Sequence, residues 1–186
     1  KFENLYLVGG TWRALFKLHL FQNKHPVHII HQYSVNYETL STFIEKIASF
    51  NKAKLKTVEY ISKSRTPYLP YSSIILDEIM RATNPKNIIC SISGIREGSL
   101  AKDYFKNIDN SQVFEKSLEY ISKKRGDLGL TYKKYHEFIK PVFDGNEHFD
   151  EKLLNLACVL SHMDWGLGAF QKAELVFQET LNTPLL

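Results

Sequence analysis

The sequence predicts an α/β domain followed by an all-helical region. Two short, apolar, β-prone runs, residues 5–8 and 87–92, each lead into a turn that contains two glycines. From residue 111 onward the hydrophobic patterns are helical, and no convincing strand interrupts them. We therefore expect residues 1–108 to form the α/β domain and residues 109–186 to form the helical domain.

The composition is that of an ordinary soluble globular protein, with 44% hydrophobic and 24% charged residues in a chain of 186. The net charge of +4 suits an anionic ligand but is too small to indicate nucleic acid. The two cysteines, Cys90 and Cys158, lie far apart in apolar segments, which is typical of buried, reduced thiols. Because no apolar run reaches the length of a membrane span and no secretory leader is present, we expect a cytoplasmic protein without a membrane partner.

The first glycine turn, Gly9–Thr11, connects the first β-prone run to an amphipathic helix predicted over residues 12–21. Glycines without Cβ atoms and the free N–H groups of a helix start suit a bound phosphate, and Thr11 could cap the helix or donate to that ligand. An ordinary tight turn with a threonine cap explains the same residues equally well. Arg13 is unfavourable near the positive end of the helix dipole, and its presence there hints at an anionic partner.

Three histidines follow at three-residue intervals, at His25, His28 and His31. On a helix this spacing could gather metal ligands, but Pro26 and the β-branched residues favour an extended segment, in which His28 and His31 face opposite sides. We expect structural histidines and no metal site.

Helical patterns fill most of the remaining chain. In the α/β part they cover residues 37–50, 53–62 and 72–81, and the two prolines of residues 65–71 separate the second helix from the third. In the helical part they cover residues 111–124, 132–143 and 150–180. The basic clusters at residues 52–56 and 123–125 lack interleaved aromatics and are interpreted as solvated helix faces or ends.

The second glycine turn follows the strand predicted over residues 87–92 and precedes a helix-prone segment, residues 100–105. Its small and charged residues are Ser93, Gly94, Arg96, Glu97 and Gly98. Backbone N–H groups can approach a ligand at the glycines, and the planar fork of an arginine matches phosphate oxygens. Taken alone, this short motif is better explained as a strand-to-helix turn with an exposed ion pair.

Two features of the helical part carry less functional information. His162 and Asp164 have the composition of a metal-binding pair, but a separation of two residues points their side chains about 200° apart on a helix, so they cannot share a metal there. Four aromatic residues fall near helical spacing and are predicted to lie in the core: Tyr132, Tyr135, Phe138 and Phe143.

Several blocks of the chain, taken in order, resemble the exopolyphosphatase/guanosine pentaphosphate phosphatase family. These are Leu7-Val-Gly-Gly-Thr-Trp-Arg-Ala-Leu15, His25-Pro-Val-His-Ile-Ile-His31, Leu69-Pro-Tyr71 and Ser91-Ile-Ser-Gly-Ile-Arg-Glu-Gly98. Leu156-Ala-Cys-Val-Leu-Ser161 and Trp165 are similar to a block in the helical region of that family. The likeness is close to about residue 100 and looser beyond residue 111.

The resemblance implies a ribonuclease-H-like half domain of the actin, hexokinase and Hsp70 superfamily, followed by a helical, HD-like region. It implies release of phosphate from polyphosphate or guanosine pentaphosphate with Mg²⁺ as cofactor. Phosphate binding would then fall on nine residues of the two turns: Gly9, Gly10, Thr11, Arg13, Ser93, Gly94, Arg96, Glu97 and Gly98.

The chain also departs from the family pattern. The family's first half, with its phosphate loop and acidic base, has no counterpart, and Gly166-Leu-Gly-Ala-Phe-Gln replaces a His-Pro-Asp-Tyr-Arg type run. The catalytic base is unidentified, since Glu97 is the only acidic residue in either turn and could equally serve in an ion pair.

Three functional hypotheses remain open. We expect the C-terminal portion of a longer enzyme, inactive alone and partnered by a second copy or by the missing half. The alternatives are a non-catalytic polyphosphate- or nucleotide-binding module and a degenerate remnant without function.

Overall fold

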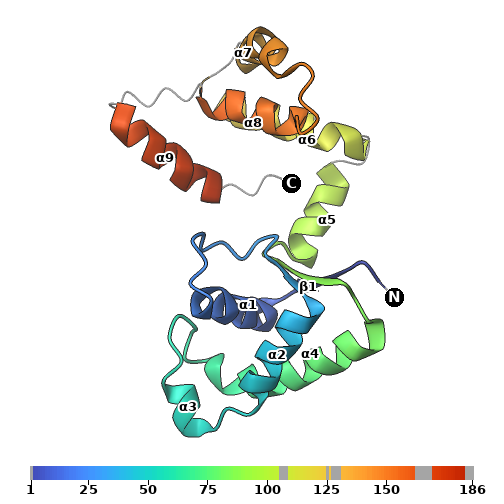
Figure 1. Ribbon diagram of the computed structural model, residues 1–186, viewed down its shortest axis with the longest axis vertical. Coiled ribbons are helices and arrows are strands. Elements are labelled where there is room, and N and C mark those ends of the chain that lie inside the picture. The colour runs from blue at the N-terminus through green and yellow to red at the C-terminus, as the bar shows by residue number, and fades with distance from the viewer. Residues whose placement is uncertain (1, 105–108, 125, 127–130, 162–168, 183–186) are drawn as a thin grey trace. The chain divides into compact units, whose positions relative to one another are not determined.

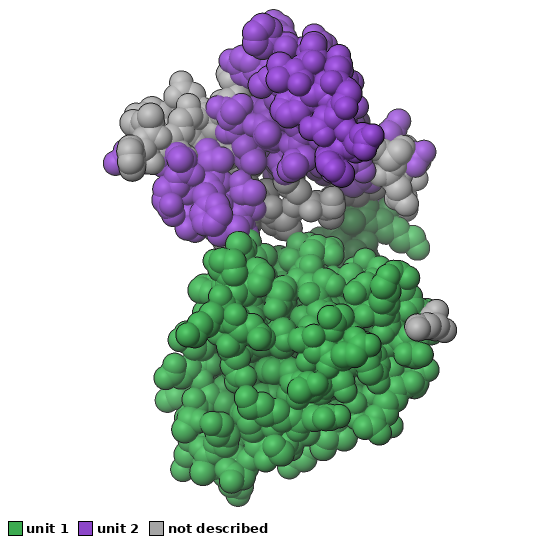
Figure 2. Space-filling model, viewed as in Figure 1, with its two compact units in different colours: residues 1–102 green, residues 103–186 purple. Residues whose placement is uncertain are grey.

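The computed structural model describes residues 2–104, 109–124, 126, 131–161 and 169–182. The chain divides into two compact units, residues 1–102 and 103–186, which are coloured separately in Figure 2. The division falls within a helix, α5 (Ile95–Tyr104), whereas the sequence analysis places the boundary at residue 108.

Unit 1 is built on a small sheet whose described strands are ordered β1-β3-β2. The central strand β3 (Asn87–Ser91) pairs in parallel with β1 (Asn4–Val8) and antiparallel with β2 (Ser34–Asn36). The two strands expected from sequence are confirmed to within one residue at each end. β2 was not predicted as a strand, because three residues are too few to show an alternating pattern.

The helices of unit 1 pack against the sheet and against one another (Figure 1). α1 (Gly10–Gln22) contacts β1 and β3, and α2 (Tyr37–Ala48) contacts β2 and β3. α4 (Leu69–Thr83) then packs on α1 and α2. Each helix contributes a buried apolar stripe, and the resulting core includes Leu15, Phe16, Leu40, Ile44, Ile47, Leu69, Leu76, Met80, Ile88 and Cys90. The unit therefore has a mixed α/β fold with one continuous core.

The prediction of a helix over residues 53–62 is correct only for its first turn. α3 (Lys52–Lys56) ends at Thr57, whose hydroxyl donates to the carbonyl of Lys54 over 2.9 Å. The chain beyond it is held by the ring of Tyr60, which stacks on Phe21 of α1. Tertiary packing has therefore overridden the local helical pattern.

The next helical segment begins earlier than predicted. A 3₁₀ turn, η1 (Thr66–Tyr68), leads directly into α4 at Leu69, three residues before the expected start. Pro70 lies in the first turn of α4, where its missing N–H group costs nothing.

Within the residues described, the regular elements of unit 2 are all helices. It consists of α6 (Asn110–Lys124), α7 (Tyr132–Ile139), the 3₁₀ turn η2 (Lys140–Phe143), α8 (Glu151–Ser161) and α9 (Ala169–Asn182). α6 and α7 pack on α8 around a separate small core of Leu118, Ile121, Tyr132, Cys158 and Val159. None of the described helices in either unit is long and apolar enough to cross a membrane.

The prediction of a four-aromatic core in unit 2 is only partly right. Tyr132 is buried, but Tyr135 and Phe138 are 45% and 85% exposed. A residue's position along a helix does not reveal which face the neighbouring helices cover, which explains the error. His162, Asp164, Trp165 and the run of residues 166–168 lie outside the described residues.

One buried polar group in unit 1 makes its stability depend on pH. His19 lies within the core, where its Nδ1 atom is 3.0 Å from the hydroxyl of Tyr33 and its ring meets the ring of Phe43 edge-on. Burial lowers the pKa of His19 from its ordinary value of 6.5 because the charged imidazolium would lose its hydration. The unfolded chain therefore binds a proton at this site at a higher pH than the folded chain does.

We predict that the free energy of unfolding falls as the pH drops below 6.5, the ordinary pKa of the histidine. Urea unfolding at pH 7.5, 6.5 and 5.5, followed by circular dichroism, measures this trend above the range in which most carboxylates titrate. The His19→Gln variant should lose much of the dependence. If the wild-type chain and this variant show equal slopes, His19 is not the group responsible.

Candidate functional site

The two glycine turns lie side by side at one edge of the sheet. β1 and β3 are parallel neighbours, and their last residues, Val8 and Ser91, are paired. The chain therefore leaves both strands at their shared carboxyl edge. A Cβ atom placed on Gly94 would lie 3.9 Å from Cγ1 of Val8, so the second turn packs directly against the end of the first strand. Parallel pairing alone thus brings together residues about 85 positions apart in sequence.

The first turn requires glycine at its first position. Gly9 has φ 137° and ψ 160°, a conformation available almost only to glycine, and it occupies the N-cap position of α1. No side chain caps this helix end. Of the two roles considered for Thr11, capping of the helix is excluded, because Gly9 is the N-cap and Thr11 lies inside the first turn. Its half-buried hydroxyl has no hydrogen-bond partner among the described residues.

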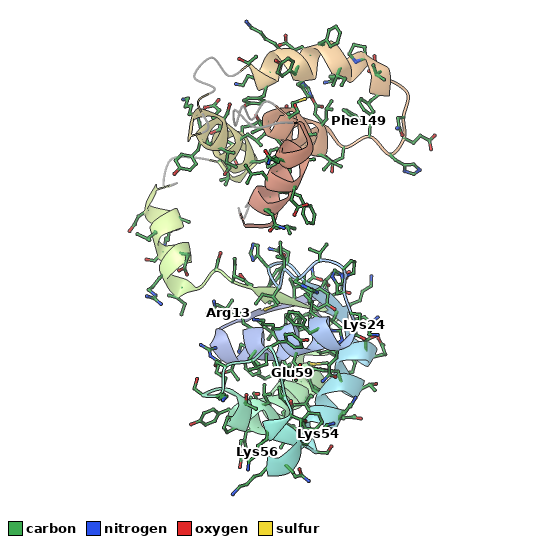
Figure 3. All side chains as sticks on the ribbon, turned by 90° about the vertical axis from the view of Figure 1, so that its left-hand side faces the viewer. Arg13, Lys24, Lys54, Lys56, Glu59 and Phe149 are labelled. Carbon is green, nitrogen blue, oxygen red and sulfur yellow. The ribbon has the colours of Figure 1, made fainter. Side chains whose placement is uncertain are left out.

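Arg13 folds back onto the same turn. Its backbone N–H donates to the carbonyl oxygen of Gly9 over 3.1 Å, and its side-chain Nε donates to the same oxygen over 3.3 Å. This second hydrogen bond holds the guanidinium group near the N-terminus of α1 (Figure 3) instead of along the helix face. An arginine at this end opposes the helix dipole, and the contact with Gly9 only partly offsets that cost.

Arg65 is a further residue of the site that sequence analysis did not identify. Its guanidinium group lies where a Cβ atom of residue 10 would project, so Gly10 is the residue that allows its approach. The arginine comes from the segment just before η1, in the proline-containing stretch that was interpreted only as a break between helices. Nothing in the local sequence connects residue 65 with residue 10, and only the folded chain reveals the pair.

The second turn differs from its predicted form, because Arg96, Glu97 and Gly98 belong to a helix and not to a loop. α5 begins at Ile95, and the N–H of Gly98 already donates to the carbonyl of Gly94 over 3.0 Å. The helix starts early because the carboxylate of Glu97 reaches back to its N-terminus. There Oε2 of Glu97 accepts the N–H of Gly94 over 2.6 Å, as in a capping box.

Before this helix, Ser91 and Ser93 bind each other. The N–H of Ser93 donates to Oγ of Ser91 over 3.2 Å, and that hydroxyl donates to the Ser93 carbonyl over 3.1 Å. These two bonds fix the path of the chain between β3 and Gly94.

The capping role of Glu97 explains its electrostatics. Backbone N–H groups of Glu97 and Gly94 lower the pKa of this carboxyl, and the nearby charges of Arg96 and Arg13 lower it further. A carboxylate that is held ionised by these bonds is a weak proton acceptor. The structure thus supports a positioning role for Glu97 and offers little support for its use as a general base.

Positive charge dominates the two turns. Arg13 influences Glu97 in the second turn and also Cys90 in β3, whose pKa is raised to about 11 mainly by burial. None of Arg13, Arg65 and Arg96 forms a salt bridge with any residue that the structure describes. Arg13 and Arg65 lie beside the uncapped start of α1, and Arg96 lies in the second turn with one engaged carboxylate, so the two turns together suit an anion with several oxygens.

The same donor set does not fit a magnesium ion. Mg²⁺ is held by carboxylate oxygens, and the only carboxylate in either turn is that of Glu97, which already accepts a backbone N–H. Within the described ranges, no group of three or more His, Cys, Asp and Glu side chains could hold a metal.

The three histidines of residues 25–31 have separate local contacts. His25 Nδ1 lies 2.7 Å from the Val27 carbonyl oxygen, the ring of His28 contacts that of Phe21, and His31 accepts the N–H of Ile92 over 3.3 Å. The segment lies outside the helices and strands, in keeping with the expectation that these residues do not form a helix.

Comparison with known protein families identifies the family of this chain. The family model described as the Ppx/GppA phosphatase family matches residues 1–106, which include both glycine turns and Arg65. No match was found among curated proteins. Since the matched region covers more than half of the 186 residues, this chain belongs to the Ppx/GppA phosphatase family.

Proposed function

We propose that unit 1 supplies the phosphate-binding wall of a phosphohydrolase that cleaves terminal phosphoanhydride bonds of inorganic polyphosphate or guanosine pentaphosphate. Membership of a phosphatase family supports the reaction class. The observation that carries the proposal is the guanidinium of Arg65 against Gly10, at a helix start that no side chain caps. We further propose that this unit is a ribonuclease-H-like half domain, in keeping with its parallel β1–β3 pair, and that the helical unit corresponds to the HD-like region of the family.

Each group in the two turns has a definite part in holding a phosphate. The first N–H groups of α1 have no acceptor within a helix and point toward the turn, where they can donate to phosphate oxygens. The Thr11 hydroxyl adds a donor, and Arg65 can bind two oxygens at once with its planar fork. Arg13 and Arg96 neutralise the remaining charge, while Ser93, Gly94 and Glu97 order the second turn. Arg65 thus joins the phosphate-binding residues expected from sequence, whereas we assign Gly98 no contact with the phosphate, because its N–H donates to the Gly94 carbonyl within α5.

Hydrolysis needs a positioned base in addition to this clamp. Glu97, the one carboxylate in the two turns, is engaged in capping α5, and we assign it no proton transfer. We therefore propose that the 186-residue chain binds polyphosphate without hydrolysing it, and that catalysis requires groups from elsewhere. A non-catalytic binding module would use the same clamp, so binding alone does not separate it from an enzyme.

We predict that Arg65→Gln weakens binding of a polyphosphate by about 10- to 100-fold, since hydrogen bonds to charged groups are worth roughly 1.5–3 kcal/mol. Arg13→Gln and Arg96→Gln should weaken it by smaller factors, because Nε of Arg13 is already engaged by the Gly9 carbonyl and Arg96 belongs to the second turn, on α5. Isothermal titration calorimetry with long-chain polyphosphate and with guanosine pentaphosphate, at low salt, measures the affinities and compares the two substrates.

The matched control is Arg81→Gln. Arg81 is also an arginine near the surface, but it pairs with Asp77 on α4, away from the turns. This variant should bind like the wild type. Equal losses in the Arg81 and Arg65 variants would mean that binding depends only on net charge. Rapid phosphate release by the unmodified chain would overturn the proposal that it binds without hydrolysis.

A second prediction concerns Gly10 itself. Gly10→Ala places a methyl group where the Arg65 guanidinium lies, and this flexible side chain must move away. The affinity for polyphosphate should fall, while stability should be unchanged or raised by up to about 1 kcal/mol, because alanine favours helix more than glycine does. Calorimetric titration and urea unfolding of the same samples separate the two effects.

The control for this variant is Gly98→Ala, at the fourth residue of α5. A Cβ atom there meets nothing within 4 Å, so both affinity and stability should be at least preserved. Unchanged polyphosphate affinity in Gly10→Ala would show that the position of Arg65 does not matter for binding.

A further inference from the structure

A cavity of about 230 Å³ lies beside the second half of α1, away from the glycine turns. Leu18 and Phe21 of α1 form one side of it, and Phe50, Val58 and Tyr60 form much of the rest. At 1.5 Å per residue, Leu18 is about 12 Å along the helix from Gly10, so this cavity is a separate feature from the phosphate-binding turns. Its walls are mainly apolar and aromatic, as in sites for small organic molecules.

Tyr60 is held in an unusual conformation at the edge of this cavity. Its φ of 67° lies in the left-handed region, which bulky residues rarely adopt, and its side chain is 56% exposed. The ring nevertheless has a fixed place, stacked on Phe21 with centroids 4.1 Å apart and planes inclined by only 6°. Backbone strain of this kind costs on the order of 1–3 kcal/mol, and here it places an aromatic ring as a wall of the cavity.

The lining also holds two neutral polar residues, Gln22 and Thr57, and two opposite charges, Lys54 on α3 and Glu59 on the segment that follows it (Figure 3). The Nζ atom of Lys54 lies 5.8 Å from the centroid of the Phe50 ring, which is itself part of the wall. Neither Lys54 nor Glu59 forms a salt bridge with a residue in the described part of the chain. The cavity thus combines apolar walls with one cationic and one anionic group that both lack a counter-charge.

We propose that this cavity binds a free aromatic α-amino acid. The aromatic ring would fill the apolar part, the carboxylate would meet Lys54, and the ammonium group would meet Glu59. The cavity is half open to solvent, and its volume of about 230 Å³ suffices for one ring with its charged groups at the mouth but is small for a nucleotide. An aromatic anion without an ammonium group would be attracted by Lys54 but repelled by Glu59. An aromatic cation without a carboxylate would be attracted by Glu59 but repelled by Lys54. Only a zwitterion uses both charges.

The test is a titration of the full 186-residue chain with L-phenylalanine, followed by amide chemical shifts in ¹H–¹⁵N NMR spectra. Shifts should concentrate at residues 18–22 and 57–60 and be absent at residues 9–11. L-Phenylalaninamide, which lacks the carboxylate, and 3-phenylpropionate, which lacks the ammonium group, should each bind about two- to fivefold more weakly. This is the range that exposed ion pairs provide.

Two variants test which group of the ligand each charged side chain binds. Lys54→Gln should abolish the preference for L-phenylalanine over L-phenylalaninamide, and Glu59→Gln should abolish the preference over 3-phenylpropionate. Both side chains are exposed, so neither substitution should unfold the domain. Lys56→Gln, on the same short helix but outside the lining, is the control and should behave like the wild type.

Three outcomes would overturn the proposal. These are the absence of shifts at millimolar L-phenylalanine, equal affinity for all three compounds, and an equal loss of affinity in the Lys56 control variant.

Discussion

The parallel pairing of β1 with β3 is the constraint on which the functional part of this protein depends. It aligns Val8 with Ser91, so that both strands end at the same edge and both glycine turns begin there. Parallel neighbours need a long connection, and here the connection contains α1, β2, α2, α3 and α4. The same chain that closes the core therefore also delivers Arg65 to the first turn. Loss of the β1–β3 pairing would separate every part of the candidate site at once.

The helices that follow the two turns differ in their N-terminal capping, and this difference suggests a different role for each turn. α5 is capped by its own Glu97, which satisfies the N–H of Gly94 and makes the second turn self-contained. α1 has no such cap, and arginines approach it where the dipole would favour an anion. An uncapped helix start with cationic side chains is an incomplete arrangement that a bound phosphate would complete. The first turn is therefore the stronger candidate for direct phosphate contact, and the second turn supports it.

α1 connects two chemically distinct surfaces of unit 1. Its first turn faces the arginines of the candidate phosphate site, and its last turns carry Leu18 and Phe21 toward the aromatic cavity. Between them, Leu15 and Phe16 are fully buried and anchor the helix in the core. Tyr60 and Arg65, only five residues apart in the chain, contact opposite ends of this helix. A single well-packed helix thus fixes the geometry of both surfaces, although their ligands would differ in charge and size.

The sequence by itself determined the order of the principal elements and the nature of the first turn. Short apolar, β-prone runs identified β1 and β3, and helical patterns identified α2 and α6, nearly to their ends, because burial in the core imposes those patterns. Gly9 was recognisable as a turn residue because a double glycine after a strand is a local signal, and its φ of 137° agrees with that expectation. The family resemblance rested on the same local blocks and is confirmed over residues 1–106.

Only the tertiary structure decided how distant groups meet. Two features depend on neighbours far away in sequence: the contact of Arg65 with Gly10 and the early ending of α3. The exposure of Phe138 depends on which face of its helix is covered. The start of α5 at Ile95 was also missed, although its cause is local, because Glu97 was considered as an ion-pair partner and not as a cap. Local sequence patterns indicate backbone preference and burial. A binding site depends instead on how side chains from distant segments meet, and no short segment of the sequence specifies that geometry.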